Sequence, residues 1–411
     1  MRYAFPMDLS LAETRAVIAR ANARLGMKGF YEAERPEGHS IFNYLIAMPA
    51  SFPEPTTGDA ALDRDFAILR ECRGLTFDLG TGLVTARKFH KFFNVGEKDE
   101  TAPHHVDWSR PHLVLHKLDG SMLTPLIGSS GRVSWHTRLG ATENAAVVSD
   151  FVDAATPRYA AFALAMGEQG QTPIFEWCSR QHRVIVDYPQ DRLVLTAVRD
   201  NRSGIYLSHA AMVGMASHFA VPVVSVLPDP VTNIEAFRTA IEERAEIEGY
   251  VVRFDDGHML KLKVPWYALR HRSKAQLQQE RDVWDLVLND RADDIKALLD
   301  GRDVAALDGF INELHAGIAR VAKRLGDRVE RGRATVGDDR KRFAMDVVNL
   351  PDTSQAEKGL LFQIYAGADP FEAVRSALRR STSSGGRLDY MRPLCDGVRW
   401  DHFRHAATQE D

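Results

Sequence analysis

Lys117-Leu118-Asp119-Gly120 places an acid and a glycine two and three positions after a lysine. It follows residues 112–116, an apolar run typical of a buried strand. An amine there suits a covalent nucleophile, because a dry pocket and neighbouring cations lower its pKa. Gly120 would let the backbone pass closely beneath a ligand. Taken alone, the pattern is common, and a surface turn after a strand is the simpler interpretation.

Further cations and carboxylates stand beside or within predicted strands. They are Arg73 in Glu71-Cys72-Arg73-Gly74, Lys91 in the aromatic run 88–94, Arg138 after the run 132–136, Glu176 between two aromatic residues, Glu248 before Gly249, and the alternating pair Lys261 and Lys263. Each has an ordinary interpretation, since arginines commonly pair with acids and alternating lysines mark a solvent face. The histidines from 90 to 116 match no zinc spacing. The informative feature is therefore the order of the whole set.

The elements that must position these residues mix strands and helices up to about residue 272. The patterns predict strands at 74–77, 83–89, 123–127, 132–136, 174–177, 183–186, 193–199, 249–254 and 258–263, and helices at 9–25 and 234–247. Turn signals such as Asp255-Asp256-Gly257 join neighbouring strands as hairpins. Because strands and helices do not alternate, we expect an α+β fold of antiparallel sheets with flanking helices.

After about residue 275 the strand signals nearly vanish. Helices are predicted at 276–299, 304–325, 354–365 and 371–380. Ser354 and Glu357 form a capping-box pattern, and Pro370 suits a first helical turn. The sequence therefore predicts two domains, residues 1–272 and an all-α C-terminal domain at residues 273–411.

The composition of the chain is that of an ordinary globular protein. A chain of 411 residues with 45% hydrophobic and 26% charged residues can bury two ordinary cores. Its net charge of −4 argues against indiscriminate coating of nucleic acid, although local basic clefts remain allowed. Three scattered cysteines suggest a reducing, cytoplasmic setting. No uncharged apolar run is long enough to span a membrane, so no membrane partner is expected.

The ordered motifs resemble those of covalent nucleotidyltransferases and, in finer detail, those of the phage T4 RNA ligase 1 family. Two segments resemble the family's upstream motifs, and four resemble its motifs I, III, IV and V. The segments are Glu71-Cys72-Arg73-Gly74, Lys91-Phe92-Phe93-Asn94, Lys117-Leu118-Asp119-Gly120-Ser121, Phe175-Glu176-Trp177, Glu248-Gly249-Tyr250-Val251, and Lys261-Leu262-Lys263 with Trp266-Tyr267. The resemblance covers residues 40 to 271 and implies a nucleotidyltransferase domain. The C-terminal part is similar only in being helical and in its position.

The resemblance implies an ATP-dependent RNA ligase that joins 5′-phosphate and 3′-hydroxyl ends through a lysyl-AMP and an RNA-adenylate. Lys117 would attack the α-phosphorus of ATP. Lys261 and Lys263 would lower its pKa and screen the phosphate charge. Glu176 would accept hydrogen bonds from the ribose hydroxyls, with Arg73 nearby.

Several roles are less specific. Lys91 and Arg138 would contact the ATP phosphates, although Arg138 stands where the family has a lysine. Glu248 would hold Mg²⁺ or Mn²⁺, and Asp119 would either orient Lys117 or assist the metal. The adenine would lie between Val251 and Phe175. His116 would read the adenine edge or merely end its strand.

The expected partner is RNA. Without a P-loop motif the chain would depend on a separate end-healing kinase or phosphatase, and repair of nicked tRNA is the natural hypothesis. The basic residues Arg331, Arg333, Arg340, Lys341 and Arg342 could contact phosphates or form a solvated helix face. A DNA ligase or capping enzyme would carry a β-rich domain after motif V. A non-catalytic RNA-binding protein is disfavoured because every expected lysine and carboxylate is present. The oligomeric state is left open.

Overall fold

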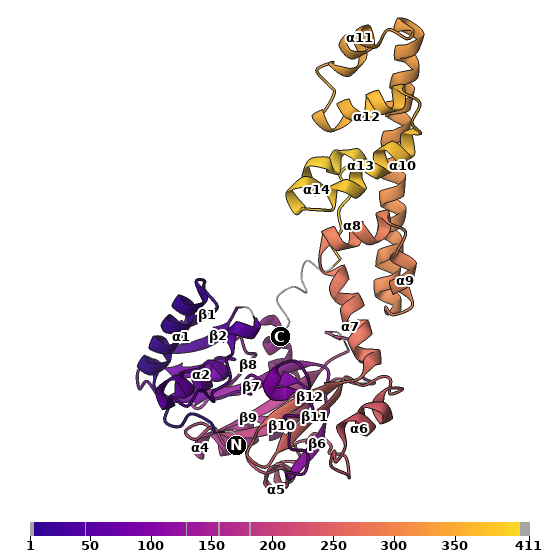
Figure 1. The fold of residues 1–411 in the computed structure, drawn as a ribbon. Coiled ribbons are helices and arrows are strands. Elements are labelled where there is room, and N and C mark those ends of the chain that lie inside the picture. Colours follow the sequence, from indigo (N-terminus) through magenta and orange to yellow (C-terminus); the bar gives the residue numbers. More distant parts are fainter. Residues whose placement is uncertain (1–3, 46, 129, 155–156, 181, 403–411) are drawn as a thin grey trace. The chain divides into compact units, whose positions relative to one another are not determined.

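The computed structural model describes residues 4–45, 47–128, 130–154, 157–180 and 182–402 (Figure 1). The chain divides into two compact units, Met1–Ala268 and Leu269–Asp411. In the described residues, strands occur only in the first unit, while the second is helical. The predicted α+β class with a helical C-terminal region is confirmed.

The first unit contains three four-stranded sheets. Its strands are β1 (Phe30–Arg35), β2 (His39–Tyr44), β3 (Leu75–Asp78), β4 (Val84–Ala86), β5 (Phe93–Asn94), β6 (His112–Lys117), β7 (Ser121–Ile127), β8 (Val133–His136), β9 (Gln171–Cys178), β10 (Arg192–Asp200), β11 (Gly249–Phe254) and β12 (Met259–Lys263). The first sheet has the order β1-β2-β3-β4, the second β10-β9-β7-β8, and the third β5-β12-β11-β6. Only the short β5–β12 pair is parallel.

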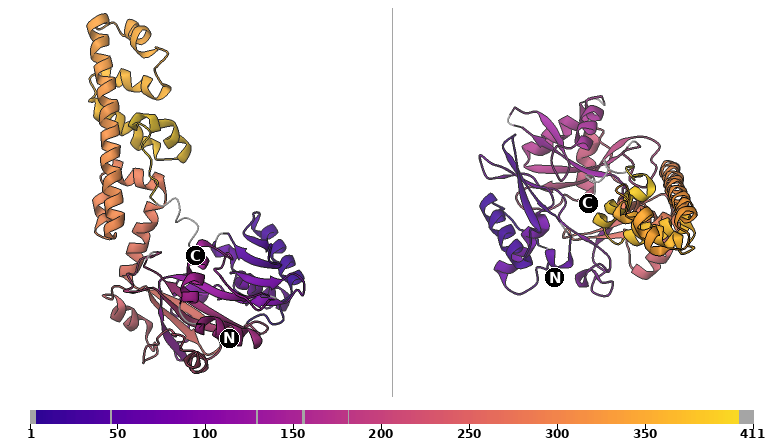
Figure 2. Two further views of the ribbon diagram at one scale, coloured as in Figure 1. Left: turned by 180° about the vertical axis from the view of Figure 1, so that it is seen from behind. Right: turned by 90° about the horizontal axis from the view of Figure 1, so that it is seen from above.

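Helices cover the outer faces of these sheets. They are α1 (Leu11–Leu25), α2 (Ala60–Glu71), α3 (Glu143–Ala154), α4 (Arg158–Glu168), α5 (His209–His218) and α6 (Ile234–Ile241), and α7 (Pro265–Leu277) spans the division between the units. Figures 1 and 2 show α1 and α2 side by side against the first sheet, where they bury a shared apolar core. The helices α3, α4 and α5 pack on the second sheet, and α6 packs on the third.

The second and third sheets face each other through their remaining faces. Ile174 and Ala197 of the second sheet share an apolar cluster with Val251 and Met259 of the third. Because side chains alternate between the two faces of a strand, every second residue of β11 and β12 points into this space. The space between the two sheets is where the charged residues of the motifs meet.

The observed elements differ from the predicted ones in places. Residues 183–186 form no strand, because the amides of Ile185 and Val186 donate to Asp119 instead of a neighbouring strand. The helix predicted at 234–247 ends at Ile241. The helix predicted at 276–299 is broken, and Asp290 has a left-handed φ of 57° at the break.

The helical unit is organised around one long helix. Its helices are α8 (Glu280–Leu288), α9 (Ala292–Lys296), α10 (Gly301–Val336), α11 (Arg340–Phe343), α12 (Gln355–Tyr365), α13 (Pro370–Ser381) and α14 (Gly385–Met391). Figures 1 and 2 show α11 to α14 arranged along one side of α10, which contributes more apolar residues to the core than any other helix of the unit. The predicted capping box of Ser354 and Glu357 and the helix start at Pro370 are confirmed.

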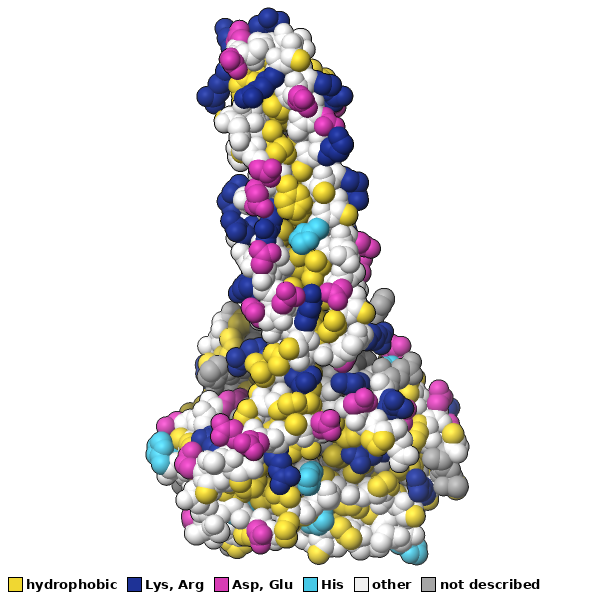
Figure 3. Space-filling model, turned by 90° about the vertical axis from the view of Figure 1, so that its right-hand side faces the viewer, with side chains coloured by type: hydrophobic (Ala, Val, Ile, Leu, Met, Phe, Trp, Pro, Cys, Tyr) yellow, Lys and Arg dark blue, Asp and Glu magenta, His cyan; other side chains and the backbone are white. Residues whose placement is uncertain are grey.

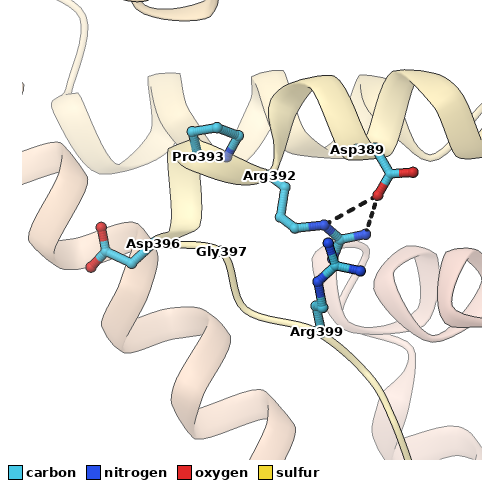
Figure 4. A pocket seen from close by; sticks show the side chains of 6 residues that line it. All are labelled: Asp389, Arg392, Pro393, Asp396, Gly397 and Arg399. Atoms are coloured by element: carbon cyan, nitrogen blue, oxygen red, sulfur yellow. Dashed lines mark hydrogen bonds and ion pairs between the residues drawn. The ribbon is translucent and has the colours of Figure 1, made fainter.

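Two surface features of the helical unit bear on its role. Figure 3 shows a column of apolar side chains along the unit, flanked by Lys and Arg and by Asp and Glu side chains. Figure 4 shows a small pocket in which the guanidinium groups of Arg392 and Arg399 lie beside each other. Arg392 is already held by Glu280 at 2.7 Å and Asp389 at 2.6 Å. We therefore assign this pocket a structural role near the end of the chain. None of the helices in the described ranges is long and apolar enough for a membrane crossing.

Candidate active site

The register of the third sheet brings its three motif lysines to one face. Gly249 of β11 lies opposite both Lys117 of β6 and Lys263 of β12, and Val251 lies opposite Lys261. Alternation along each strand then points all three lysines to the same side. The face is the one directed at the second sheet, because Val251 belongs to the cluster between the sheets.

Glu248 is the centre of the charged cluster. Its carboxylate forms ion pairs with Lys117 Nζ at 2.7 Å and with Lys263 Nζ at 3.3 Å, and its side chain is only 5% exposed. Burial opposes the charge on Lys117, but the carboxylates of Glu248, Glu176 and Asp119 outweigh burial and raise the pKa of Lys117. The sequence led us to expect a lowered pKa. Adjacent lysines were visible in the motifs, whereas this ion pair depends on how β6 and β11 align.

Lys261 and Glu176 have pKa values displaced toward their neutral forms. Burial, reinforced by Arg73, Lys117, Lys91 and Lys263, lowers the pKa of Lys261 well below its usual value. Its ammonium lies 4.8 Å from the centre of the Phe92 ring. Burial also raises the pKa of Glu176 to about 7, although Lys117 opposes that shift. Both pKa shifts are caused by burial together with the many charges of the site.

Asp119 holds two distant backbone amides by hydrogen bonds. One carboxylate oxygen accepts the amides of Ile185 at 2.7 Å and Val186 at 2.6 Å, and the other accepts the Tyr267 hydroxyl at 2.6 Å. The amide of Asp119 donates to the Tyr188 hydroxyl at 2.8 Å. Both oxygens have protein donors and the residue is 4% exposed, which favours the orienting role over the metal role among the two predicted for Asp119. It fixes the turn that follows Lys117.

Gly120 is required for a different reason from the predicted one. A Cβ at this position would lie 2.2 Å from the carbonyl oxygen of Trp177. The glycine therefore allows close approach of the β6–β7 turn to β9, which carries Glu176. The close contact is with protein backbone, where the sequence suggested a ligand.

Three predicted phosphate or nucleotide contacts meet around Tyr44, at the end of β2. Lys91 Nζ lies 5.2 Å and the Arg138 guanidinium 5.0 Å from the Tyr44 ring, and Arg73 is hydrogen-bonded to its hydroxyl. Burial opposes ionisation of Tyr44, but these three cations lower its pKa. A second contact joins Arg73 to Met122 Sδ at 3.1 Å. The cations come from three separate segments and form one positive surface suited to phosphates.

The comparisons with known proteins place the chain in a family. A family model described as RNA ligase matches residues 71–267. A predicted RNA ligase of Thermovibrio ammonificans is 33% identical over 274 residues, which cover 64% of this chain and 69% of that protein. The chain belongs to the T4 RNA ligase 1-like family of RNA ligases.

Two further relatives extend the comparison. RNA ligase 1 of bacteriophage TS2126 is 27% identical to this RNA ligase over 305 residues, covering 72% of each chain. The solved structure of an archaeal ATP-dependent RNA ligase is 16% identical, with a TM-score of 0.41, and the match covers 63% of this chain and 64% of that one.

The ligase does not bring every predicted residue into the cluster. His116 precedes Lys117 on a strand and so points to the opposite face, where its ring lies 5.3 Å from that of Tyr250. Phe175 is fully buried behind the second sheet among Trp135 and Tyr159. Val251 alone of the predicted base contacts is half-buried on the face of the lysines.

Sequence reasoning missed three tyrosines of the ligase site. Tyr44 joins the cationic surface, and Tyr188 and Tyr267 hold Asp119. Tyr267 was visible beside Lys263 in the motif V segment but had no assigned role. Tyr44 and Tyr188 lie in no recognised motif, so only the folded arrangement reveals them.

A divalent cation fits part of this arrangement. The carboxylate of Glu248 is buried and contributes to the raised pKa of the half-buried Glu176, and carboxylate oxygens are the ligands that Mg²⁺ and Mn²⁺ prefer. Within the described ranges, no three His, Cys, Asp or Glu side chains form a preassembled metal set. Glu248 is thus the residue that could hold a metal, once its two lysine partners have moved aside.

Proposed function

We propose that this RNA ligase consumes ATP to join a 5′-phosphate to a 3′-hydroxyl through a lysyl-AMP on Lys117. The observation that carries the proposal is the cluster on one sheet face in which the half-buried lysines Lys117, Lys261 and Lys263 surround the buried Glu248. The cationic surface around Tyr44 supports it, because a triphosphate needs several positive groups.

The proposed reaction has three balanced steps. Lys117 Nζ bonds to the α-phosphorus of ATP while the bond to the bridging oxygen breaks and pyrophosphate leaves. An oxygen of the RNA 5′-phosphate then displaces Lys117 and forms RNA-adenylate. The 3′-hydroxyl oxygen finally attacks the 5′-phosphate and expels AMP. The ammonium of Lys117 loses its proton to solvent before the attack, and Glu248, which is ion-paired with it, holds the side chain in place.

The remaining residues stabilise charge in this proposal. Lys261 and Lys263 neutralise the α-phosphate, and Arg73, Lys91 and Arg138 hold the leaving pyrophosphate. Glu176 binds the ribose. A Mg²⁺ or Mn²⁺ ion held by Glu248 would supply further positive charge to the phosphates.

We further propose tRNA repair as the biological role, in the cytoplasm, with 5′-phosphate and 3′-hydroxyl ends supplied by a separate end-healing kinase or phosphatase. The helical unit would dock the RNA. Arg331 and Lys341 support this, since both are exposed at the end of α10 and the start of α11. Arg333 and Arg340 instead lie over the rings of Tyr365 and Phe362.

Label transfer tests the proposed chemistry directly. The ligase is incubated with Mg²⁺ and ATP labelled at the α-phosphate, denatured, and examined for label on the chain. We expect covalent label from ATP and none from GTP. A ligase that is free of AMP by intact mass and still takes no label would refute the proposal.

The raised pKa of Lys117 predicts a pH dependence for the first step. Only the free amine attacks, so at saturating ATP the rate should rise up to roughly tenfold per pH unit between pH 6.5 and 8.5. Glu248→Gln removes the main carboxylate partner and should shift the profile to lower pH while reducing its height. Single-turnover adenylylation measures both, and Glu243→Gln, an exposed carboxylate in the segment before β11, is the matched control. An unshifted profile in Glu248→Gln would contradict the assigned ion pair.

Docking of RNA by the helical unit predicts a salt-dependent defect. Arg331→Ala combined with Lys341→Ala should weaken binding of nicked tRNA and make the plot of log affinity against log salt shallower by about two. Adenylylation should be unchanged. Lys323→Ala is the control, because this exposed lysine of α10 is paired with Asp327 at 2.8 Å. Equal salt slopes for the double variant and the wild type would favour the alternative of a solvated helix face.

A further inference from the structure

A lysine outside the motif positions lies fully buried beneath the turn that carries Arg73. Lys88 is 2% exposed, and its ammonium donates to the carbonyl oxygen of Gly74 at 2.9 Å and lies 3.4 Å from Thr76 Oγ1. In the described part of the chain, no carboxylate forms an ion pair with it. Three titratable groups interact with it electrostatically: Arg73 lowers the pKa of Lys88, and Lys88 lowers the pKa values of His39 and His136. Burial, with Arg73 nearby, lowers the pKa of Lys88 to about 7.

A buried lysine without a carboxylate partner lowers the free energy of unfolding. An ammonium in a protein interior without a counter-charge is unfavourable, and its hydrogen bonds to a carbonyl and a hydroxyl recover only part of the lost hydration. A methionine of similar length would fill the same space without that cost. The contacts of Lys88 must therefore be explained by what they hold in place.

Those contacts hold two of the cations around Tyr44. Gly74 has a φ of +82°, and a Cβ there would lie 2.7 Å from Lys88 Cδ and 2.9 Å from the Cα of Arg138. The turn is thus packed closely against both the lysine stem and the Arg138 backbone. The amide of Gly74 donates to the carbonyl of Phe42 at 2.9 Å, which ties the same turn to β2 and hence to Tyr44.

We propose that Lys88 is a positioning residue for ATP binding, which fixes the Gly74 turn so that Arg73 and Arg138 converge on the phosphates at Tyr44. The inference rests on the proposed function of those arginines. It extends that function to a residue that touches no substrate. Lys88 acts on binding of the triphosphate and leaves the attack by Lys117 unaltered.

Lys88→Met tests this assignment. In single-turnover adenylylation at pH 6.5, the ATP concentration for half-maximal rate should rise at least tenfold, and the rate at saturating ATP should change less than threefold. Sealing of preadenylated RNA, which needs no triphosphate, should be unchanged. The melting temperature should equal or exceed that of the wild type, because a buried uncompensated charge has been removed. A purely structural lysine would give a lower melting temperature and an unchanged ATP dependence.

Two further variants keep the outcome decisive. Lys88→Gln retains an amide donor and should show a smaller rise in the ATP requirement, and it replaces Lys88→Met if that variant does not fold. Lys274→Met is the control, since this partly buried lysine is ion-paired with Asp303 at 3.6 Å in the helical unit. It should lose stability without any change in ATP dependence. A folded Lys88 variant whose ATP requirement lies within twofold of the wild type overturns the inference. Absence of labelling in the wild type would instead refute the proposed function.

Discussion

Lys117→Ala is expected to abolish covalent labelling by ATP. No other side chain in the cluster can replace the nucleophile, because Lys261 and Lys263 stand on β12, which β11 separates from the strand of Lys117, and Lys263 is held by Glu248. Loss of the attacking group should reduce adenylylation by a factor on the order of 10³ or more. Sealing of RNA with 5′-phosphate ends should fall to the same extent.

The same variant should retain part of its activity on preadenylated RNA. That substrate enters after the step that needs Lys117 as the nucleophile, so loss of the amine leaves the final attack of the 3′-hydroxyl possible. Lys263→Ala is the informative control. It removes the second ammonium on Glu248 but keeps the nucleophile, and we expect slower labelling that still reaches completion. Normal sealing of 5′-phosphate RNA by Lys117→Ala would exclude the lysyl-AMP pathway.

Glu71→Ala is expected to cause the largest loss of stability of any single change considered. The carboxylate of Glu71 accepts hydrogen bonds from Arg199 Nη2 at 2.7 Å and from Arg87 Nε at 3.1 Å. All three side chains are at most 1% exposed. Arginine cannot shed its charge by titration. Removing the carboxylate leaves two buried guanidinium groups uncompensated, which should lower the free energy of unfolding by about 3–5 kcal/mol.

Thermal unfolding measures this effect. A loss of that size should lower the melting temperature by roughly 10 °C in a unit of this length. The comparison is Glu34→Ala, because Glu34 is 63% exposed and its pair with Arg15 should contribute less than about 1 kcal/mol. Equal melting temperatures for the two variants would show that the buried network contributes little. The network also contacts the residue proposed to position the Gly74 turn, since Arg199 donates to the carbonyl of Lys88 at 2.6 Å.

Part of the site could have been read more fully from the sequence. Lys117 follows the predicted strand 112–116, and alternation continued by one residue places His116 and Lys117 on opposite faces. The same rule separates Phe175 from Glu176. These two outcomes needed only a period of two, whereas placing Val251 with the lysines also needs the register of β11 with β6 and β12.

Other features depend on contacts between distant segments. The backbone amides of residues 185 and 186 could have joined a strand, and the sequence pattern favoured that choice. In the fold they donate to Asp119, 66 and 67 positions earlier, because this buried carboxylate needs donors once Tyr267 has taken only one of its oxygens. The same contacts favour the orienting role of Asp119, one of its two predicted roles.

The sequence by itself determined the family, the order of its motifs and the division into a strand-containing part followed by helices, because these follow from residue type, spacing and local periodicity. The tertiary structure decided which charges meet. The pKa of Lys117 is raised because β6 and β11 align Lys117 with the segment that begins at Glu248, and Arg73, Lys91 and Arg138 converge only through Tyr44. Electrostatic energies depend on distances across the fold, and such distances are not encoded in any local pattern.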